Sequence, residues 1–425
     1  MLARRLKRRL IAESESAGHY MFIFFRWTVI AAVTGVVGGV VGALFHMAVN
    51  AATEFRGEHG WVIFTLPAAG ALIALIYHIF GFDNDGGTNL IISSIRTKDH
   101  VPLRMAPLIF VATVITHLAG GSAGREGAAL QLGGSIGNRI GELFGVKEQD
   151  IGLAVMCGMS ALFSALFGTP LTACFFAMEV ISVGVIYYAG LVPCIASSLT
   201  AYGISLLMKA EPTRFNISKF VPHLSFGSVV RVCILAAVCA VSIFFCVAMK
   251  TANKWFSQIF ENKYLRAAVG GAVILALTLL LRTTDYNGAG MNVIENAVLE
   301  GNAHPAAFLL KIIFTAVTIG CGFKGGEIVP TMFIGATLGC AFSPLIGLDA
   351  RFAAAVGIVA LFCSVVNCPT ASLFLSLELF GSEGIFLFAA ACGVSYMLSG
   401  YYGLYSSQKI VYSKLHTRYI NKRTK

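Results

Sequence analysis

The chain has 425 residues, of which 57% are hydrophobic and only 12% are charged, and its formal net charge is +10. This composition is typical of polytopic membrane proteins and argues against a large soluble protein. We therefore expect an all-α polytopic membrane protein embedded in the lipid bilayer.

The positive charge lies largely at the two ends of the chain. Basic residues are frequent in residues 1–19, before the long apolar stretch Met21–Val49, and again in residues 413–425. Tails rich in Lys and Arg stay cytoplasmic, so we expect both termini inside, an even number of crossings and a multi-pass protein of the plasma membrane. No nucleic-acid partner is expected, because basic flanks of membrane segments usually set topology or contact anionic lipid.

Further apolar stretches follow, for example Trp61–Phe80, Val229–Met249 and Ala267–Leu281. Others are short or interrupted by glycine, so hydropathy does not fix the number of crossings. The eleven cysteines lack the paired spacing of zinc or redox sites. No nucleophile, phosphate-loop or dinucleotide motif is present. We therefore expect no metal, no cofactor and no catalytic residues, and the chain is not predicted to be an enzyme.

The first polar break in the apolar sequence is Gly86-Gly-Thr-Asn-Leu-Ile91. Thr88 or Asn89 could cap the helix that follows, which is one interpretation of their presence. Either side chain could also offer a hydroxyl or an amide to an anion at the start of that helix.

The second break places Arg125 and Glu126 inside an apolar, glycine-rich stretch. A carboxylate at bilayer depth is costly, and the surrounding glycines argue against one continuous helix. Broken helices at this depth are buried in protein or line a watery cavity, and they direct their positive ends at anions. Glu126 is thus the predicted gate: ionised, it occupies the anion's site, and protonated, it leaves with a proton. The alternative is a structural carboxylate paired with Arg125 or with a helix N-terminus.

The third break is Gly325-Gly-Glu-Ile-Val-Pro-Thr331, which resembles the second. The backbone N–H groups of Ile328 and Val329 could face an anion, with Pro330 near the first turn of a helix.

Two further side chains are candidates for the same path. Glu327 is a second unusual carboxylate, which could carry a proton or, alternatively, cap a helix or pair with Lys324. Tyr405 follows the last apolar stretch and could donate its hydroxyl to an anion without adding a charge. Taken alone, Tyr405 would be an interfacial tyrosine.

The sequence contains a weak internal duplication. Gly158-Met-Ser-Ala-Leu-Phe163 reappears as Gly357-Ile-Val-Ala-Leu-Phe362, and each copy is followed by a proline and then a glutamate: Pro170 and Glu179, Pro369 and Glu378. We expect two related halves, residues 20–205 and 228–412, joined by a linker at 206–227. An odd number of crossings in each half would make the repeats inverted, with the substrate near the midplane. For the two glutamates we expect a shared structural or interface role.

With these segments placed, the chain resembles the CLC family of anion channels and transporters over residues 20–412. The GREGP signature of the family corresponds to Gly124-Arg-Glu-Gly-Ala128, and its GxFxP segment to Gly326-Glu-Ile-Val-Pro330. The helix-terminal tyrosine corresponds to Tyr405, and the GSGIP segment to Gly87-Thr-Asn-Leu-Ile91.

This resemblance implies a CLC fold of two inverted-topology helical repeats with broken and re-entrant helices. It also implies a homodimer in which each subunit has its own pathway. The anion-binding positions that it implies are Thr88 or Asn89, Ile328, Val329 and Tyr405, with Gly124, Arg125, Gly127, Gly326 and Pro330 as supporting motif residues.

Differences from the chloride-transporting branch of the family indicate which branch this chain resembles. Exchangers of that branch carry a second glutamate, the inner proton acceptor, where this chain has Val180 after Glu179. Ile328 replaces a phenylalanine, and Glu327 stands where the chloride branch is apolar. This pattern resembles the CLC-F branch of fluoride/proton antiporters, in which Thr88 would be an atypical choice.

The physical properties of fluoride are consistent with these differences from the chloride branch. Fluoride is small and strongly hydrated, so a site must replace its water with strong donors, such as a protonated carboxyl group. Two carboxylates, Glu126 and Glu327, would also repel each other when both are ionised, which favours protonation of one. The leading hypothesis is fluoride export driven by inward proton flow. The alternative is chloride/proton exchange or a passive CLC-type chloride channel.

Overall fold

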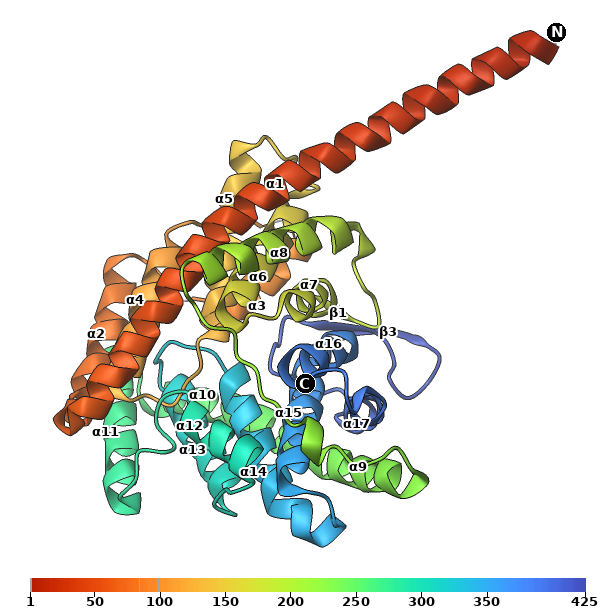
Figure 1. The fold of residues 1–425 in the computed structure, drawn as a ribbon. Coiled ribbons are helices and arrows are strands. Elements are labelled where there is room, and N and C mark those ends of the chain that lie inside the picture. Colours follow the sequence, from red (N-terminus) through yellow and green to blue (C-terminus); the bar gives the residue numbers. More distant parts are fainter. Residues whose placement is uncertain (1, 84, 98) are drawn as a thin grey trace.

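The computed structural model describes residues 2–83, 85–97 and 99–425, without the side chains of residues 2–16. All the Lys and Arg side chains of residues 1–19, which were predicted to keep the N-terminus cytoplasmic, therefore lie outside the described residues. Within the described part of the chain, the molecule is almost entirely helical (Figure 1).

The first half of the chain forms α1 (Leu2–Glu58), α2 (Leu66–Ile79), α3 (Thr88–Thr97), α4 (Met105–Ala119), α5 (Glu126–Leu143), α6 (Ile151–Phe167), α7 (Pro170–Glu179) and α8 (Leu191–Leu207). The second half forms α9 (Phe226–Val238), α10 (Ser242–Ile259), α11 (Lys263–Leu281), α12 (Met291–Glu295), α13 (Ala307–Gly320), α14 (Ile328–Ile346), α15 (Ala350–Val366), α16 (Pro369–Phe380) and α17 (Ile385–Leu398). The short 3-10 turns are η1 (Gly60–Thr65), η2 (Tyr188–Gly190), η3 (Ser218–Phe220) and η4 (Cys239–Val241), and a π-helical turn, η5 (Asn296–Glu300), extends α12.

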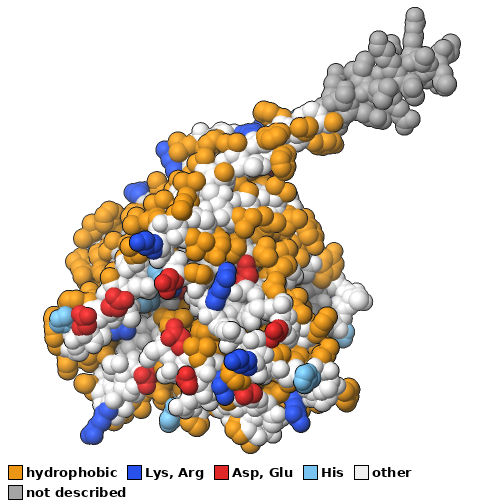
Figure 2. All heavy atoms as spheres, in the orientation of Figure 1, with side chains coloured by type: hydrophobic (Ala, Val, Ile, Leu, Met, Phe, Trp, Pro, Cys, Tyr) orange, Lys and Arg blue, Asp and Glu red, His pale blue; other side chains and the backbone are white. Residues whose placement is uncertain are grey.

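The outer surface of the molecule is suited to lipid. Of the described helices, six are long and apolar enough to cross a membrane. Large apolar side chains remain exposed on them, such as Phe226 at 87%, Leu207 at 80% and Leu280 at 77%. Figure 2 shows hydrophobic side chains over much of one face, with the Asp and Glu side chains gathered in its lower part and Lys and Arg more widely spread. Exposed apolar surface of this extent indicates contact with a bilayer rather than with water.

Glycines let the inner helices pack backbone to backbone. A Cβ on Gly158 of α6 would collide with the Gly133 carbonyl oxygen of α5, and a Cβ on Gly357 of α15 would collide with that of Gly335 in α14. Close approach through small residues is the usual way in which membrane helices associate. The same contact thus forms once in each half.

The duplication seen in the sequence is a duplication of structure. The residues before α7 and α16, Thr169 and Cys368, have nearly identical backbone angles (φ −123° and −122°, ψ 76° in both). The two glycine-rich breaks meet in an antiparallel bridge, in which Gly124 and Gly326 exchange two N–H···O bonds of 2.7 Å. Antiparallel pairing of equivalent segments is what an inverted repeat requires. In Figure 1, α4–α8 lie above α13–α16.

Glu179 and Glu378 bind the two halves together reciprocally. Glu378 ends α16, and its carboxylate accepts from the N–H groups of Leu171 and Thr172 at the start of α7, at 2.8 and 2.9 Å. Glu179 ends α7 and accepts from the N–H groups at the start of α16, at 3.3 and 3.0 Å. Each carboxylate therefore caps the positive end of the equivalent helix in the other half. The predicted shared structural role is confirmed.

A small sheet, which the sequence analysis did not predict, closes the C-terminal end. β1 (Ser182–Val183) pairs in parallel with β2 (Lys409–Tyr412), which pairs antiparallel with β3 (Tyr419–Arg423). The segment after β3 returns to the helices, where the Thr424 hydroxyl donates to the Tyr405 carbonyl oxygen at 2.6 Å. Part of the predicted basic tail is therefore tied to the loop that holds Tyr405.

Candidate functional site

The site lies where the N-termini of α5 and α14 meet. Glu126 is the first residue of α5, and Glu327 immediately precedes α14. Glycine is required beside them, because a Cβ on Gly127 would lie 2.9 Å from the Gly326 Cα. Two helix N-termini directed at one place supply unpaired N–H groups and positive dipole ends, which together favour an anion. Pro330 lies in the first turn of α14, as predicted.

Glu126 occupies this place in the structure. Its side chain is fully buried, its Oε2 accepts from the Arg125 N–H at 3.0 Å, and the Val329 N–H also reaches the carboxylate. Its Oε1 has no hydrogen-bond partner among the described residues and lies 3.7 Å from the Arg125 Nε. The contacts that the structural alternative predicted, with Arg125 and with a helix N-terminus, are thus observed. The two roles are compatible, because an anion would use the same donors.

Glu327 lies beside the bridge with one free oxygen. Its side chain does not cap α14, and Lys324 pairs with the Asp85 Oδ2 at 3.0 Å instead. Neither structural alternative for Glu327 is therefore observed. Its Oε2 is buried without a hydrogen-bond partner in the described chain, 3.2 Å from the position that a Cβ on Gly127 would take.

The structure separates the roles of Thr88 and Asn89. The Thr88 hydroxyl donates to the Gly127 carbonyl oxygen at 3.2 Å, so this side chain reaches the centre of the site. Asn89 instead accepts from the Ser407 N–H at 2.9 Å and ties α3 to the Tyr405 loop. Both side chains therefore bind other segments. Neither of these bonds caps α3.

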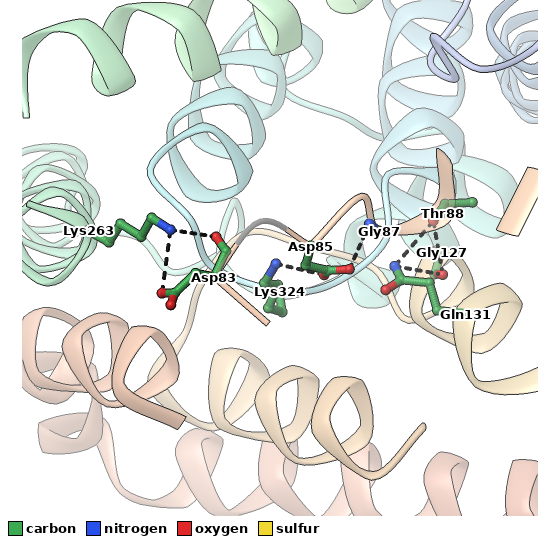
Figure 3. A network of polar contacts seen from close by, with 8 residues as sticks. All are labelled: Asp83, Asp85, Gly87, Thr88, Gly127, Gln131, Lys263 and Lys324. Carbon is green, nitrogen blue, oxygen red and sulfur yellow. Dashed lines mark hydrogen bonds and ion pairs between the residues drawn. The ribbon is translucent and has the colours of Figure 1, made fainter. Parts of the chain in front are cut away.

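Gln131 is a site residue that the sequence analysis did not single out. Its Nε2 lies 3.3 Å from the Thr88 Oγ1 and 3.3 Å from the Gly127 carbonyl oxygen (Figure 3), while its Oε1 has no partner among the described residues. The available signal was its position one helical turn after Gly127, on a face that is otherwise apolar.

Tyr405 is buried, with 2% exposure, and its hydroxyl has no hydrogen-bond partner in the described structure. The Leu404 N–H fixes the loop by donating to the Val365 carbonyl oxygen at 3.0 Å. This hydroxyl is thus a neutral donor without an acceptor. Ile328, by contrast, buries its side chain in the core and offers only its backbone.

A cavity of about 620 Å³ opens beside these groups, and we call it the Tyr405-side cavity. Its inner wall includes Thr88, Gln131, Glu327 and Tyr405. Its charged wall residues are Asp83, Asp85, Lys250, Lys263, Arg266 and Lys324.

Two ion pairs line this cavity. Figure 3 shows Asp83 paired with Lys263 and Asp85 paired with Lys324. Asp85 also accepts from the Gly87 N–H, and the next residue, Thr88, contacts Gly127 and Gln131. In the loop after α2, a hydrogen bond from His78 and the charge of Lys263 lower the pKa of the Asp83 carboxyl, so this residue stays ionised at neutral pH.

A second cavity, of about 570 Å³, shares no wall residue with the first, and we call it the Arg56-side cavity. Arg56, His117, Arg125, Asn287 and Val329 are among its wall residues. Arg125 and Val329 face this cavity, whereas Glu327 faces the Tyr405-side cavity. Glu126 itself is in neither wall: it contacts Arg125 and Val329 of the Arg56-side cavity, and the next residue, Gly127, accepts from Thr88 and Gln131 of the Tyr405-side cavity.

Long apolar helices, an internal repeat and buried polar groups at joined helix N-termini are features typical of a membrane transport protein. Residues 69–400 match the family model described as voltage gated chloride channel. The chain belongs to this family, and it is therefore an ion-transport protein rather than an enzyme.

Particular relatives agree with this assignment. The chain is 36% identical to a chloride/fluoride channel protein of Pseudomonas syringae pv. tomato, over 92% of this chain and 88% of that protein. It is 24% identical to the H(+)/Cl(-) exchange transporter ClcA of Vibrio parahaemolyticus, over 84% of this chain and 82% of that one. A solved structure of a CLC-type fluoride/proton antiporter matches with a TM-score of 0.88 at 31% identity, covering 91% of this chain and 98% of that chain. A slow cyanobacterial Cl-/H+ antiporter matches in fold, with a TM-score of 0.75 at 20% identity over 88% and 94% of the two chains.

Proposed function

We propose that this chain exchanges fluoride for protons across the plasma membrane and exports fluoride, with Glu126 as its gate. The observation that carries this proposal is the position of the Glu126 carboxylate. It is fully buried between two cavities, among backbone donors at the joined starts of α5 and α14. A tethered carboxylate in an anion site leaves when it is protonated, and an anion then takes its donors.

The remaining site groups have roles that follow from their positions. Tyr405 donates its free hydroxyl proton to the anion on the Tyr405 side, and Thr88, which Gln131 orients, turns its hydroxyl proton from the Gly127 carbonyl oxygen to the anion when the site is occupied. The Ile328 and Val329 amides act at the start of α14. Glu327 faces the same cavity with a free oxygen, so it transfers the proton or, when protonated, donates to fluoride.

Fluoride is favoured over chloride by the strength of the donors. A strongly hydrated anion needs short, strong hydrogen bonds to replace its water. A neutral tyrosine hydroxyl, a threonine hydroxyl and a carboxyl group meet this requirement, and the wall of the Tyr405-side cavity contains all three. The relatives named for fluoride, at 36% and 31% identity, support the same choice.

One observation favours the alternative of a passive channel or a chloride exchanger. Val180, at the position of the inner proton glutamate of chloride exchangers, is fully buried, and its carbonyl oxygen accepts from Gln408 at 2.9 Å. No carboxylate stands there to receive a proton. Under the proposal, the proton leaves past Glu327 by the same route as the anion.

Purified protein in liposomes tests the proposal with paired fluoride and chloride electrodes and a pH electrode. We expect faster fluoride than chloride release, accompanied by proton movement in the opposite direction. The Glu126→Gln variant should lose proton movement. Glu142→Gln, which changes a half-buried carboxylate paired with Arg139 and His100 outside both cavity walls, is the control and should transport normally. Chloride release as fast as fluoride release, or full coupling in Glu126→Gln, would contradict the proposal.

Assembly and orientation are part of the same proposal. We infer a homodimer with one pathway per subunit, both termini cytoplasmic, and halves at residues 20–205 and 228–412 joined by 206–227. Since α1 starts at the cytoplasmic terminus and ends next to Arg56, the Arg56-side cavity is then extracellular. Labelling of an introduced cysteine at Thr53 by an impermeant reagent, from one side only, tests this orientation.

A further inference from the structure

The Arg56-side cavity is surrounded by positive charge. Arg56 and Arg125 are both in its wall, and among the described wall residues there is no Asp or Glu. Lys311 of α13 lies just behind the wall, fully buried, where its Nζ donates to the carbonyl oxygens of Tyr286 and Gly288 at 3.1 and 2.8 Å. A cleft with one sign of charge and low-dielectric walls concentrates ions of the opposite sign.

The partners of these cations leave charge uncompensated. Arg56 donates to the carbonyl oxygen of His117, and its guanidinium lies against Gly288, where a Cβ would come within 2.9 Å of Nη2. Arg125 donates to the Asn50 side chain at 3.0 Å, and its only nearby carboxylate in the described chain is Glu126. Among the described residues, Arg125 thus has one carboxylate beside it, whereas Arg56 and Lys311 have carbonyl oxygens and, for Lys311, the Phe333 ring as partners, with no carboxylate within ion-pair distance. A partly buried cation without an anionic partner favours the binding of an anion.

The wall also offers groups suited to a hydrated ion. His117 is buried, with its Nδ1 at 2.9 Å from the Thr113 carbonyl oxygen, and its Nε2 has no partner in the described structure. If Nδ1 carries the proton, Nε2 accepts a hydrogen bond from a water molecule. Asn50 and Thr53 add polar side chains along the same wall. At about 570 Å³, the cavity has room for an anion that keeps part of its water shell.

We propose that the Arg56-side cavity is a second anion site, which holds a partly hydrated halide between Arg56 and Arg125 next to the gate. This proposal rests on the proposed function, because it gives fluoride a position on the side of Glu126 opposite to Tyr405. Fluoride loses its remaining water only when Glu126 moves away and the backbone donors become free. Fluoride thus loses its water in two steps, partly on binding in this cavity and completely on passing Glu126. Arg56 sets the affinity of the first of these steps.

Diffraction from crystals of the full chain soaked in bromide tests the site directly, because bromide scatters anomalously. We expect an anomalous peak in the Arg56-side cavity of the wild type, a much weaker peak in Arg56→Gln and a retained peak in Arg56→Lys, which keeps the charge. Absence of the peak in the wild type, or an equal peak in Arg56→Gln, overturns the proposal. This readout does not depend on transport, so a wild type that moves no fluoride would refute the proposed function and leave the site testable.

Transport in liposomes gives a second readout. Loss of one charge-assisted contact should raise the half-saturating fluoride concentration of Arg56→Gln about tenfold, with the maximal rate retained. A merely structural role for Arg56 would lower the maximal rate at an unchanged half-saturating concentration, and that result overturns the proposal. Arg231→Gln is the matched control, because Arg231 also donates to a carbonyl oxygen, that of Gly347, but lies outside the cavity wall.

Discussion

At the scale of single residues, the site is marked by polar atoms that the fold leaves unused. Glu126 Oε1, Glu327 Oε2, Gln131 Oε1 and the Tyr405 hydroxyl are buried without hydrogen-bond partners among the described residues. Each such group costs about 1–3 kcal/mol of folding free energy. Other unpaired buried polar atoms occur in the described chain, for example in Tyr77 and Ser242, but these four belong to residues in or next to the joined starts of α5 and α14 and the Tyr405-side cavity, where an anion would supply the missing partner.

Glu327 offers the sharpest test at this scale. Glu327→Gln keeps the volume of the side chain and its ability to donate a hydrogen bond, but removes its ability to release a proton. We therefore expect fluoride to keep moving, while the number of protons moved per fluoride falls severalfold. Simultaneous fluoride-electrode and pH recordings on liposomes measure this ratio. An unchanged ratio would limit Glu327 to anion binding, and the control Glu179→Gln should leave the ratio unaltered, since Glu179 caps α16.

Which residues belong to the site was only partly predictable from the sequence. Glu126 and Glu327 could be predicted because a charged residue within an apolar stretch is recognisable from that stretch alone, without knowledge of its neighbours in space. The choice between Thr88 and Asn89 was not predictable, since it depends on contacts with Gly127 and Ser407, which come from distant segments. Gln131 was missed for the same reason: an uncharged side chain in a helix becomes informative only when its neighbours in space are known.

At the scale of elements, reciprocal capping makes the two halves depend on each other. Glu378 satisfies two N–H groups of α7 and also accepts from the Thr172 hydroxyl at 2.7 Å. Glu378→Ala leaves these donors unsatisfied, so we expect a loss of about 1–3 kcal/mol in the free energy of unfolding. Thermal unfolding of the purified protein should show a lower midpoint for Glu378→Ala than for Glu378→Gln, which keeps one acceptor.

Transport supplies the control for that prediction. Because Glu378 lies outside the walls of both cavities, the number of protons per fluoride should be unchanged in the folded fraction of Glu378→Ala. A changed ratio with an unchanged unfolding midpoint would contradict a structural role and assign the residue to ion movement.

The small sheet of β1, β2 and β3 is the part of the fold that could not be predicted from the sequence. β1 is two residues long and β2 is four, and the two are separated by more than two hundred residues. Neither strand is long enough to establish a period of two, and β3 consists mostly of exposed polar residues. Its pairing with β2 is decided by the return of the chain to the Tyr405 loop, which is a tertiary effect. The long helices and their X-Pro starts, by contrast, are specified locally.

At the scale of the whole molecule, the two cavities and the single gate between them imply a definite thermodynamic behaviour. In an exchanger, fluoride leaves as a proton enters, so at equilibrium fluoride accumulates on the acidic side of the membrane. Diffusion of neutral hydrogen fluoride through lipid moves both species together and accumulates fluoride on the alkaline side. A passive channel held at zero voltage accumulates fluoride on neither side. The direction of accumulation therefore distinguishes the three mechanisms.

We expect liposomes containing the protein, with the voltage clamped at zero by potassium and valinomycin, to concentrate fluoride on the acidic side. For one-to-one exchange, a pH difference of one unit can sustain a gradient of about tenfold. Protein-free liposomes should show the opposite direction through leakage, and Glu126→Gln should match them, because without a protonatable gate the pH difference cannot drive the anion. Accumulation on the alkaline side in the wild type would mean that the two buried cavities conduct no coupled exchange. Absence of a gradient despite rapid fluoride flux would identify a pore, in which case the carboxylate between the cavities blocks the anion without carrying a proton.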